Sequence, residues 1–531
     1  MPAGNWSRHL PDGFDFDPAQ LGRGDNLTAP WAQRWGRQPG ADVLRMVADN
    51  GGPDGGGGWW SAARLDEATR SAAGRLVALG VSPGHRVVWS TTTSAASIVA
   101  GLAVLRLGAV LVPANAAYTE REVGHIVADV RPRLAIVERD EQAGWVDTAS
   151  GSSAGVVGPD LVAWGGADRR SPGAGSAGSL DRGGTLDSAG RHDPALIVYT
   201  SGTTGRPKGA VLSHANLLAA TESLALAWQW TPEDRLVLAL PLFHVHGLCA
   251  GLFGSLAAGA PVVVLPRFGA GEVLDAAADH RGTMFFGVPT MYHRLLASGR
   301  VSELARLRLS VSGSAALAPS LWEEIRAESG VAVLERYGMT ETQLTVSNPL
   351  RGERRPGTVG FPLPGVEIRI DPQEGDGGPG EGEGEGQLLV RGPTVFSGYW
   401  ERKAADEAAF VDGWFRTGDV VAEDADGYLA IRGRRTDLII SGGYNVYPAE
   451  VEEVLLGHPG VAEVAVTGTP STEWGQQVTA WVVAAGPPPG VEELLAYAAP
   501  LLADYKRPRA VRFVGTLPRN ALGKVLRGEL R

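Results

Sequence analysis

Short apolar runs alternate with longer helical patterns along most of the chain. Residues 86–89 have the pattern of a strand, and residues 94–106 have the pattern of a helix. A second strand is predicted over 109–113, and a second helix over 120–129. Because strands that alternate with helices form mostly parallel sheets, the pattern predicts an α/β fold.

The pattern changes after Gly433, where strand-like runs at 438–440, 462–467 and 478–484 precede a helix pattern over 491–502. We therefore predict a large N-terminal domain of stacked, mostly parallel sheets with flanking helices over 1–433. A hinge over 434–437 and a small, mobile α+β C-terminal domain over 438–531 would follow. Glycine and serine dominate 151–190, which predicts a flexible connector, and the glycine-rich acidic stretch 373–386 predicts a surface turn.

Composition narrows the class of protein. A chain of 531 residues exceeds the size of a single hydrophobic core. Its net charge of −11, with no basic patch, argues against nucleic acid as a partner. Cys249 is the single cysteine, which excludes an internal disulfide framework. The most apolar region, 236–265, is interrupted by prolines and histidines, so we expect a buried core there and no membrane span. We expect a cytoplasmic monomer or homodimer.

The most informative stretch is 199–209, with the sequence YTSGTTGRPKG, directly after an apolar run. Glycines allow backbone N–H groups to approach a polyphosphate, hydroxyls donate to its oxygens, and a lysine neutralises its charge. Lys208 is one of only four lysines in the chain. Pro207 before it and Gly209 after it break the phosphate-loop pattern of common NTPases, so a different nucleotide chemistry is predicted.

Six further motifs follow in order: PLFH at 241–244, SGSAAL at 312–317, ERYGMTE at 335–341, WFRTGD at 414–419, GR at 433–434 and PRNALGK at 518–524. With the glycine-rich stretch they resemble the adenylate-forming superfamily of acyl-CoA synthetases, luciferases and peptide-synthetase adenylation domains. The resemblance covers the chain from about residue 40 to 531. It implies two half-reactions. A carboxylate first attacks the α-phosphate of ATP to form an acyl-adenylate, and the thiol of coenzyme A then displaces AMP.

The resemblance also implies a role for each motif. Catalysis would fall to Lys208, His244, Glu341 and Lys524. Lys524 would meet the charge that develops at the α-phosphate, and His244 would gate the acyl site. Thr200 and Glu341 would bind Mg²⁺, which prefers carboxylate, hydroxyl and phosphate oxygens. The residues implied in nucleotide and coenzyme binding are Thr200, Ser201, Gly202, Thr203, Thr204, Gly205, Lys208, Gly313, Ser314, Glu335, Arg336, Tyr337, Gly338, Met339, Thr340, Asp419, Arg434, Ser441, Gly442 and Gly443.

Within this family a domain rotation presents Lys524 in one state and the loop at Gly442 and Gly443 in the other. Thr436 stands where many relatives carry an acidic residue or lysine, so the pivot is not identified. Structural interpretations of single residues compete with these roles: Asp419 as a turn residue, Arg434 in a surface ion pair, Tyr337 as a core aromatic, and one of the two neighbouring histidines as a packed core residue.

The acceptor and the acid are predicted separately. No carrier-protein segment follows Lys524, which favours coenzyme A as the acceptor. Residues 286–294 would line the acyl pocket together with His244 and Met339, and Arg294 could grip a second carboxylate with two parallel hydrogen bonds. This segment resembles the malonyl-CoA synthetase branch, which implies malonate or methylmalonate as the acid. The alternatives are a short- or medium-chain acyl-CoA synthetase, an aryl-CoA ligase, and a nucleotide-binding relative without catalysis.

Overall fold

The structure of the protein is a computed structural model. It describes residues 5–11, 13–14, 16–47, 58–162, 185–200, 207–317, 319–371, 385–434, 439–442, 444–446, 448–518, 525 and 527–530. Within these residues the strands form four sheets, two of them large and mostly parallel. The predicted α/β class is therefore confirmed.

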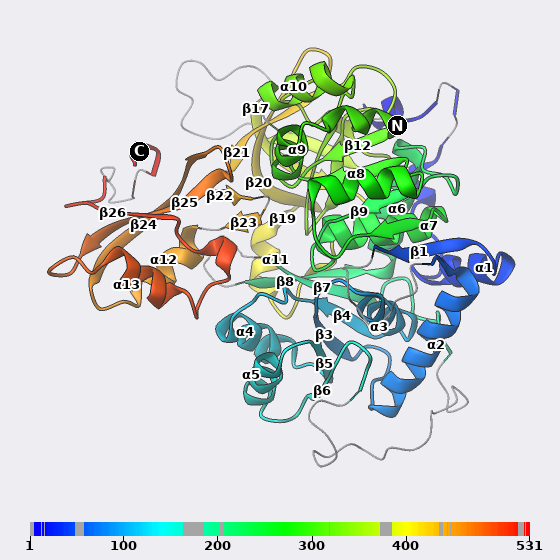
Figure 1. The fold of residues 1–531 in the computed structure, drawn as a ribbon, viewed down its shortest axis with the longest axis horizontal. Helices are drawn as coiled ribbons and strands as arrows, with labels where there is room; N and C mark the ends of the chain where they lie inside the picture. The colour runs from blue at the N-terminus through cyan, green and yellow to red at the C-terminus, as the bar shows by residue number, and fades with distance from the viewer. Residues whose placement is uncertain are drawn as a thin grey trace.

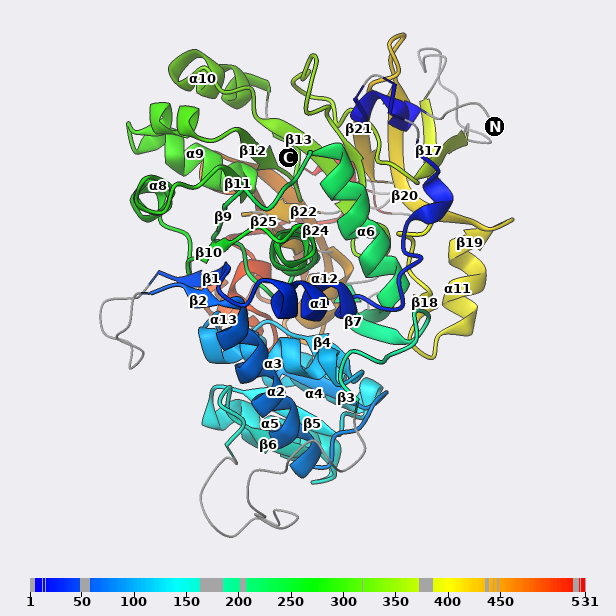
Figure 2. The same cartoon turned by 90° about the vertical axis from the view of Figure 1, so that its right-hand side faces the viewer.

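The larger sheet contains, in spatial order, β15 (Phe361–Pro362), β14 (Gln343–Ser347), β13 (Leu334–Met339), β12 (Leu309–Ser312), β11 (Met284–Gly287), β9 (Leu236–Leu238), β10 (Val262–Val264), β1 (Asp42–Met46) and β2 (Trp60–Ser61). The second contains β18 (Gly398–Tyr399), β8 (Lys208–Ser213), β7 (Pro194–Thr200), β4 (Val110–Pro113), β3 (Arg86–Ser90), β5 (Leu134–Val137) and β6 (Gly155–Val157). Figures 1 and 2 show the first sheet above the second.

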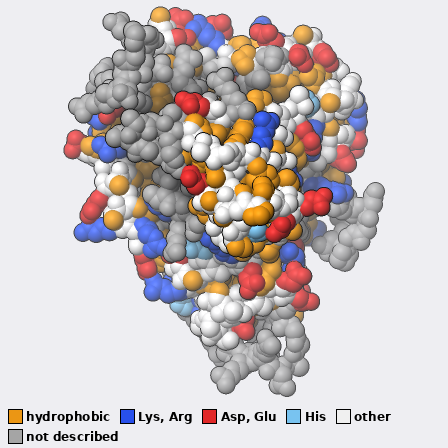
Figure 3. Space-filling model, turned by 90° about the vertical axis from the view of Figure 1, so that its left-hand side faces the viewer, with side chains coloured by type: hydrophobic (Ala, Val, Ile, Leu, Met, Phe, Trp, Pro, Cys, Tyr) orange, Lys and Arg blue, Asp and Glu red, His pale blue; other side chains and the backbone are white. Residues whose placement is uncertain are grey.

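Two smaller sheets complete the fold. One joins β16 (Glu367–Asp371), β17 (Glu385–Arg391), β20 (Trp414–Glu423), β19 (Phe410–Val411) and β21 (Leu429–Arg434). The other joins β23 (Tyr444–Val446), β22 (Ile439–Ser441), β25 (Gly475–Ala484), β24 (Val461–Ser471) and β26 (Ala510–Phe513). We call this last sheet, with its helices α12 (Pro448–Leu456) and α13 (Val491–Ala498), the C-terminal unit. It lies beside the larger body in Figure 1. Figure 3 shows a face of this unit with hydrophobic side chains near its centre and charged ones around them.

The helices are α1 (Ala29–Arg37), α2 (Ala62–Ala78), α3 (Ala95–Arg106), α4 (Glu120–Val130), α5 (Asp140–Ser150), α6 (His214–Ala227), α7 (Gly254–Ala258), α8 (Ala270–Asp279), α9 (Pro289–Ala297), α10 (Pro319–Ser329), α11 (Lys403–Ala409), α12 (Pro448–Leu456) and α13 (Val491–Ala498). A π-helix, His246–Phe253, precedes α7. Side-chain caps explain several starts: Ser94 accepts from the N–H of Ser97 before α3, and Thr119 and Glu122 form a capping box before α4.

Packing follows the apolar patterns. The all-round apolar helix α3 and most of α6 lie in the central core, which contains residues of both large sheets, such as Leu196 and Leu238. Helices α8, α9 and α10 cover the outer face of the larger sheet, and α4 and α5 cover the outer face of the second. The apolar region 236–265 is buried in these cores, as predicted.

The predicted strands at 86–89 and 109–113 and the helices at 94–106 and 120–129 are confirmed within one or two residues. The helix predicted over 491–502 is shorter and ends at Ala498. The expectation of a flexible connector over 151–190 was wrong at its ends. Strand β6 begins at Gly155, and Asp187 is bound to Arg106; residues 163–184 lie outside the described part. The predicted surface turn 373–386 lies outside it except for its last two residues, which open β17.

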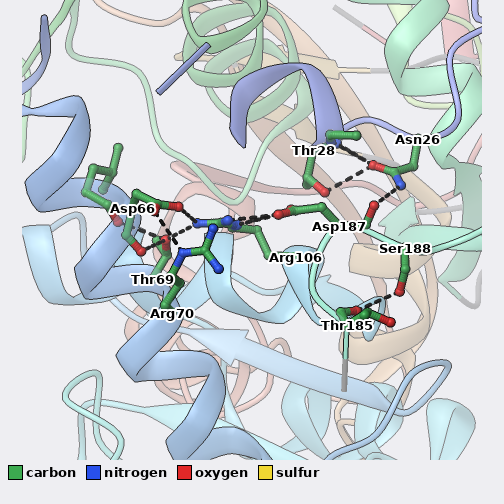
Figure 4. A network of polar contacts seen from close by, with 11 residues as sticks. Asn26, Thr28, Asp66, Thr69, Arg70, Arg106, Thr185, Asp187 and Ser188 are labelled. Atoms are coloured by element: carbon green, nitrogen blue, oxygen red, sulfur yellow. Dashed lines mark hydrogen bonds and ion pairs between the residues drawn. The ribbon is translucent and has the colours of Figure 1, made fainter. Parts of the chain in front are cut away.

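Asp187 belongs to a polar network around a buried arginine (Figure 4). The guanidinium of Arg106, whose side chain has no exposed area, lies 2.8 Å from carboxylate oxygens of both Asp187 and Asp66. It also donates to Thr69 at 2.7 Å. A charge buried in a core needs charged or hydrogen-bonding partners. The ion pair with Arg106 fixes Asp187 in place. The glycine- and serine-rich composition of the segment does not show this pair.

We expect Asp187→Asn to lower the thermal midpoint by several degrees. It leaves a buried guanidinium with one carboxylate, at a cost of about 3 kcal/mol. Arg70→Met is the control, because Arg70 makes an exposed pair with Asp66 worth well under about 1 kcal/mol. Differential scanning fluorimetry checks both variants, and equal midpoints for Asp187→Asn and wild type would contradict the prediction.

Candidate functional site

The carboxylate of Glu341 joins the two large sheets. Glu341 follows β13 of the larger sheet and is 5% exposed. Its Oε1 accepts a hydrogen bond from Thr200 Oγ1 at 3.3 Å and another from the Tyr399 hydroxyl at 2.9 Å. Thr200 ends β7 and Tyr399 lies in β18, both in the second sheet. A carboxylate and a hydroxyl at this junction are an oxygen pair that fits Mg²⁺, which completes its shell with phosphate and water oxygens.

The predicted phosphate-binding stretch begins and ends beside this carboxylate. Thr200 and Lys208 face each other across the antiparallel pair β7 and β8. Ser201, Gly202, Thr203, Thr204 and Gly205 lie outside the described residues. The Lys208 ammonium lies 5.2 Å from the ring centroid of Tyr399, a cation–π distance. Lys208 and the Glu341 carboxylate, a predicted Mg²⁺ ligand, are thus both in contact with Tyr399.

Two residues predicted to bind the nucleoside are in contact. The Tyr337 hydroxyl donates to Asp419 Oδ2, and Asp419, in β20, is 2% exposed. Asp419 is paired in register with Arg434 on β21, although the Arg434 side chain lies outside the described residues. Tyr337 packs partly against the central core and its hydroxyl also meets a carboxylate, while Asp419 lies within strand β20 and not in a turn. Their roles in binding the nucleoside stay predictions.

The hairpin of β13 and β14 is unusually tight. A Cβ at Gly338 would lie 1.9 Å from the carbonyl oxygen of Gln343, so only glycine fits there. Glu335, at the start of this motif, accepts from the N–H of Leu317 at 2.9 Å. Burial raises the pKa of Glu335 to about 7.

A cavity of about 260 Å³ lies beside these elements. Its polar lining includes His244, His246, Arg294 and Ser314, and the Ser314 hydroxyl lies 3.3 Å from His246 Nδ1. The cavity is also lined by Leu240, Pro241, Gly247, Phe268, Val288, Thr290, Met291, Gly442, Tyr444, Glu473 and Trp474. The position of Arg294 on the proposed acyl cavity thus agrees with the sequence prediction.

A smaller cavity of about 70 Å³ adjoins it at His244. Met339 and Thr340 line this smaller space with Thr200 and Glu341. Met339 lines this smaller cavity and not the larger one; its predicted contact with the acyl group stays a prediction. His244 is the residue shared by both spaces, which agrees with its predicted position at the gate.

Arg336 is a buried cation beside the acyl cavity. Its side chain is packed against Gly313, where a Cβ would lie 2.3 Å from the guanidinium carbon. Its Nε and Nη2 have no hydrogen-bond partner among the described residues. Burial lowers the pKa of Arg336 to about 9. Burial and this charge also lower the pKa of His244 to about 4, so that imidazole is neutral at pH 7. Arg336 therefore lies close to the two histidines of the acyl cavity, although it does not itself line either cavity. Its predicted role in binding the nucleotide stays a prediction.

The C-terminal unit contributes one wall of the acyl cavity. Gly442 lines it, and a Cβ there would lie 2.8 Å from the ring of Trp474. Ser441 is buried and paired with Gly475, while Gly443 and Lys524 lie outside the described residues. Val525 packs on a cluster of the C-terminal unit that contains Trp481.

The sequence analysis missed several residues that the structure places at the site: Tyr399, Tyr444, Trp474 and Lys506. Tyr399 and Tyr444 lie in very short strands with no distinctive pattern. Lys506 had one available signal, namely that it is one of four lysines in an arginine-rich chain.

Two large sheets, a small C-terminal domain and a junction of hydroxyl, carboxylate and lysine are features of a nucleotide-activating α/β enzyme. The chain belongs to the AMP-binding enzyme family: it matches the sequence profile of that family over residues 31–400 and that of the AMP-binding enzyme C-terminal domain over 450–524. It is an AMP-forming acid–thiol ligase that uses ATP and coenzyme A. Its resemblance to malonyl-CoA synthetases is confirmed by the relatives described next.

The malonate–CoA ligase of Arabidopsis thaliana is 35% identical over 85% of this chain and 78% of its own. The oxalate–CoA ligase of the same plant is 36% identical over 88% of this chain and 91% of its own. A solved malonyl-CoA ligase, in a ternary product complex with methylmalonyl-CoA and AMP, is 40% identical, with a TM-score of 0.76, and covers 95% of this chain and 100% of that one. Relatives this similar act on different acids, so membership establishes the reaction and leaves the acid open.

Among the described residues, none of the helices has both the length and the apolar character needed to cross a bilayer.

We expect Tyr399→Phe to weaken metal–nucleotide binding about tenfold, because one hydrogen bond to the Glu341 carboxylate is lost while the ring beside Lys208 stays. Binding of Mn²⁺–ATP, followed by electron paramagnetic resonance, measures this without turnover. Tyr428→Phe is the matched control, since the Tyr428 hydroxyl donates to the Glu353 carbonyl away from the site. An unchanged affinity in Tyr399→Phe would contradict the prediction.

We expect Glu335→Gln to remove a pH-dependent loss of stability. The folded pKa of Glu335, about 7, exceeds the usual 4.5, so the folded protein binds the proton more tightly. The free energy of unfolding of wild type therefore falls by up to about 3 kcal/mol as the pH rises from 4.5 through 7. That of the variant does not fall in this way. The melting midpoint of the variant relative to wild type should rise between pH 5 and pH 8. The exposed Glu323→Gln should show no such rise, and a parallel pH dependence of Glu335→Gln and wild type would refute the assignment.

Proposed function

We propose that the protein is an ATP- and Mg²⁺-dependent ligase that joins malonate, or a close relative such as methylmalonate, to coenzyme A. The main observation in support of this acid is the buried guanidinium of Arg336, which has two nitrogens unpaired among the described residues. An unpaired buried charge costs several kcal/mol. A carboxylate bound beside it would offset that cost, whereas a neutral acyl chain would leave it in place.

Arg294, which lines the cavity, supports the same acid. Arg294 lies on α9 and is exposed. It lines the same cavity as His246 and Ser314. An exposed arginine attracts an anion, and a buried one fixes it by charge-assisted hydrogen bonds. We assign the distal carboxylate of the substrate to these two guanidinium groups, with Arg336 as the main contact.

The reacting carboxylate would then lie towards His244, the residue that both cavities share. Because the pKa of His244 is lowered to about 4, its neutral imidazole adds no charge at the point where the acid passes. Tyr337 and Asp419 would bind the adenosine, and Lys208 the phosphates. Thr200 and Glu341 would hold Mg²⁺, whose charge offsets that of the phosphates when it is bound. Lys524 would serve the adenylation step.

The chain's own residues also suggest how the second half-reaction is served. Gly442 and Tyr444 line the acyl cavity, and Val525 packs within the C-terminal unit. We interpret this arrangement as the one in which the Gly442 loop faces the acyl group for attack by coenzyme A. We further propose that residues 434–437 form the hinge, with the N-terminal domain before it and the C-terminal domain from 438 onwards.

We expect malonyl-CoA to be the main product when wild type receives ATP, Mg²⁺, coenzyme A and equal amounts of malonate, methylmalonate, oxalate, butyrate, octanoate and cinnamate. Arg336→Met should lower kcat/KM for malonate by about 100-fold, because truncating one partner of a buried charged pair costs 2–5 kcal/mol. Its activity with butyrate should hold or rise. Arg294→Ala should show a smaller loss. Mass spectrometry of the thioesters measures all of these.

Arg70→Ala, at an exposed position far from the cavity, is the control and should match wild type. The apolar lining by Phe268, Val288 and Met291 favours a short-chain acyl-CoA synthetase as the second candidate. Butyryl-CoA as the main product, with Arg336→Met unaffected, would establish that candidate and reject malonate.

A further inference from the structure

A buried ion pair connects the C-terminal unit to the large N-terminal part. Lys506 Nζ lies 2.9 Å from Glu122 Oε1, and the two side chains are 5% and 7% exposed. Glu122 lies in the first turn of α4, which covers the second large sheet. Lys506 ends a 3-10 turn, Asp504–Lys506, that leads into β26.

Both charges are held by further contacts. The other carboxylate oxygen of Glu122 accepts from the N–H and the hydroxyl of Thr119, at 2.8 and 2.9 Å. The Lys506 ammonium lies 5.2 Å from the ring centroid of Tyr118 and 5.7 Å from that of Tyr505. A buried ion pair stabilises a structure when its geometry is good and its remaining polar atoms have partners. These contacts meet both conditions.

Stacked aromatic rings connect this pair to the acyl gate. Tyr505, the neighbour of Lys506, stacks on Tyr444 with ring centroids 4.4 Å apart. The Tyr444 ring is in turn 6.4 Å from the His244 ring, and both residues line the acyl cavity. Tyr505 and Lys506 also close the smaller cavity that contains Thr200 and Glu341. Lys506 is thus connected, through its neighbour Tyr505, to Tyr444 in the wall of the acyl cavity.

The pair can form only in one arrangement of the two parts. Glu122 belongs to the N-terminal part and Lys506 to the C-terminal unit, so any rotation between them separates the charges. Removing one partner while the parts stay docked leaves an uncompensated buried charge, which costs several kcal/mol. The pair thus stabilises the arrangement in which the C-terminal unit lies against α4. Loss of the pair favours arrangements in which the two parts are separated.

We propose that Lys506 is a positioning residue for thioester formation: by pairing with Glu122, it holds the C-terminal unit in the arrangement that places Gly442 and Tyr444 against the acyl group. This inference rests on the two half-reactions of the proposed function. Lys506 acts through the docking and takes no part in bond making. Adenylation, which uses the other arrangement, does not depend on the pair.

The first experiment separates the half-reactions in Lys506→Met. We expect the consumption of enzyme-bound acyl-adenylate after addition of coenzyme A, followed by rapid quench, to slow by about tenfold or more. Pyrophosphate release without coenzyme A should stay within about threefold of wild type. Lys403→Met is the matched control, because the Lys403 side chain is 91% exposed, and both of its rates should equal those of wild type.

Charge reversal tests the pairing itself. Glu122→Lys and Lys506→Glu should each slow the thioester step, and the double variant should recover at least part of the rate, because opposite charges meet again. Equal slowing of both half-reactions in Lys506→Met, or no slowing of either, would overturn the proposal. Loss of folding would appear in both half-reactions and in the melting midpoint.

A second measurement needs no substrate. Cys249 is buried, so dyes on Ala128→Cys of α4 and Glu492→Cys of α13 report the spacing of the two parts by single-molecule energy transfer. Lys506→Met should depopulate the main transfer state of wild type, and identical distributions would overturn the proposal. If wild type made no acyl-adenylate from any acid, the proposed function would fail, while this distance measurement would still decide whether the pair of Lys506 and Glu122 holds the two parts together.

Discussion

The hydrogen bonds to one carboxylate, that of Glu341, connect the two large sheets at the site. Thr200 and Tyr399 approach it from the second sheet, while Glu341 extends from the first. Because oxygen atoms bound to one acceptor lie within about 3 Å of it, the sheets cannot slide past each other without losing both bonds. The start of the phosphate-binding stretch, the lysine at its end and the proposed metal ligand are thereby placed together, and the remaining site is arranged around them.

The sequence predicted the parts of this site that are local in the chain, and missed those made by distant contacts. The strand before Thr200, the helix starts at Ser94 and Thr119 and the motif ending at Glu341 all carry their signal within a few residues. Tyr399 and Lys506 function through partners 58 and 384 positions away. No periodicity encodes such contacts. The surroundings of Arg336 are set by the fold in the same way, which brings it against Gly313 and near the two histidines; its assignment to the nucleotide stays a prediction.

Three buried cations illustrate how charge is used differently within one fold. Arg106 is paired with two carboxylates and orders the segment before β7. Lys506 is paired with one carboxylate of another structural unit. Arg336 has two nitrogens with no partner in the described part of the chain. Removing each of these charges from water is unfavourable. The cation with two fixed carboxylate partners stabilises the fold, the one with a single partner can hold two parts of the chain together, and the one with unpaired nitrogens can bind an anionic ligand.

The walls of the acyl cavity come from both parts of the chain, and this division has a consequence for specificity. Arg294 and His246 belong to the N-terminal part, whereas Gly442, Tyr444 and Trp474 belong to the C-terminal unit. In the domain rotation proposed above, the first group would stay in place and the second would leave. Under the proposed function, recognition of the acid depends on the first group, because the acid would be bound before thioester formation begins. The second group can only enclose an acid that has already been selected. Changes to the C-terminal wall should alter the rate of thioester formation and leave the choice of acid unchanged.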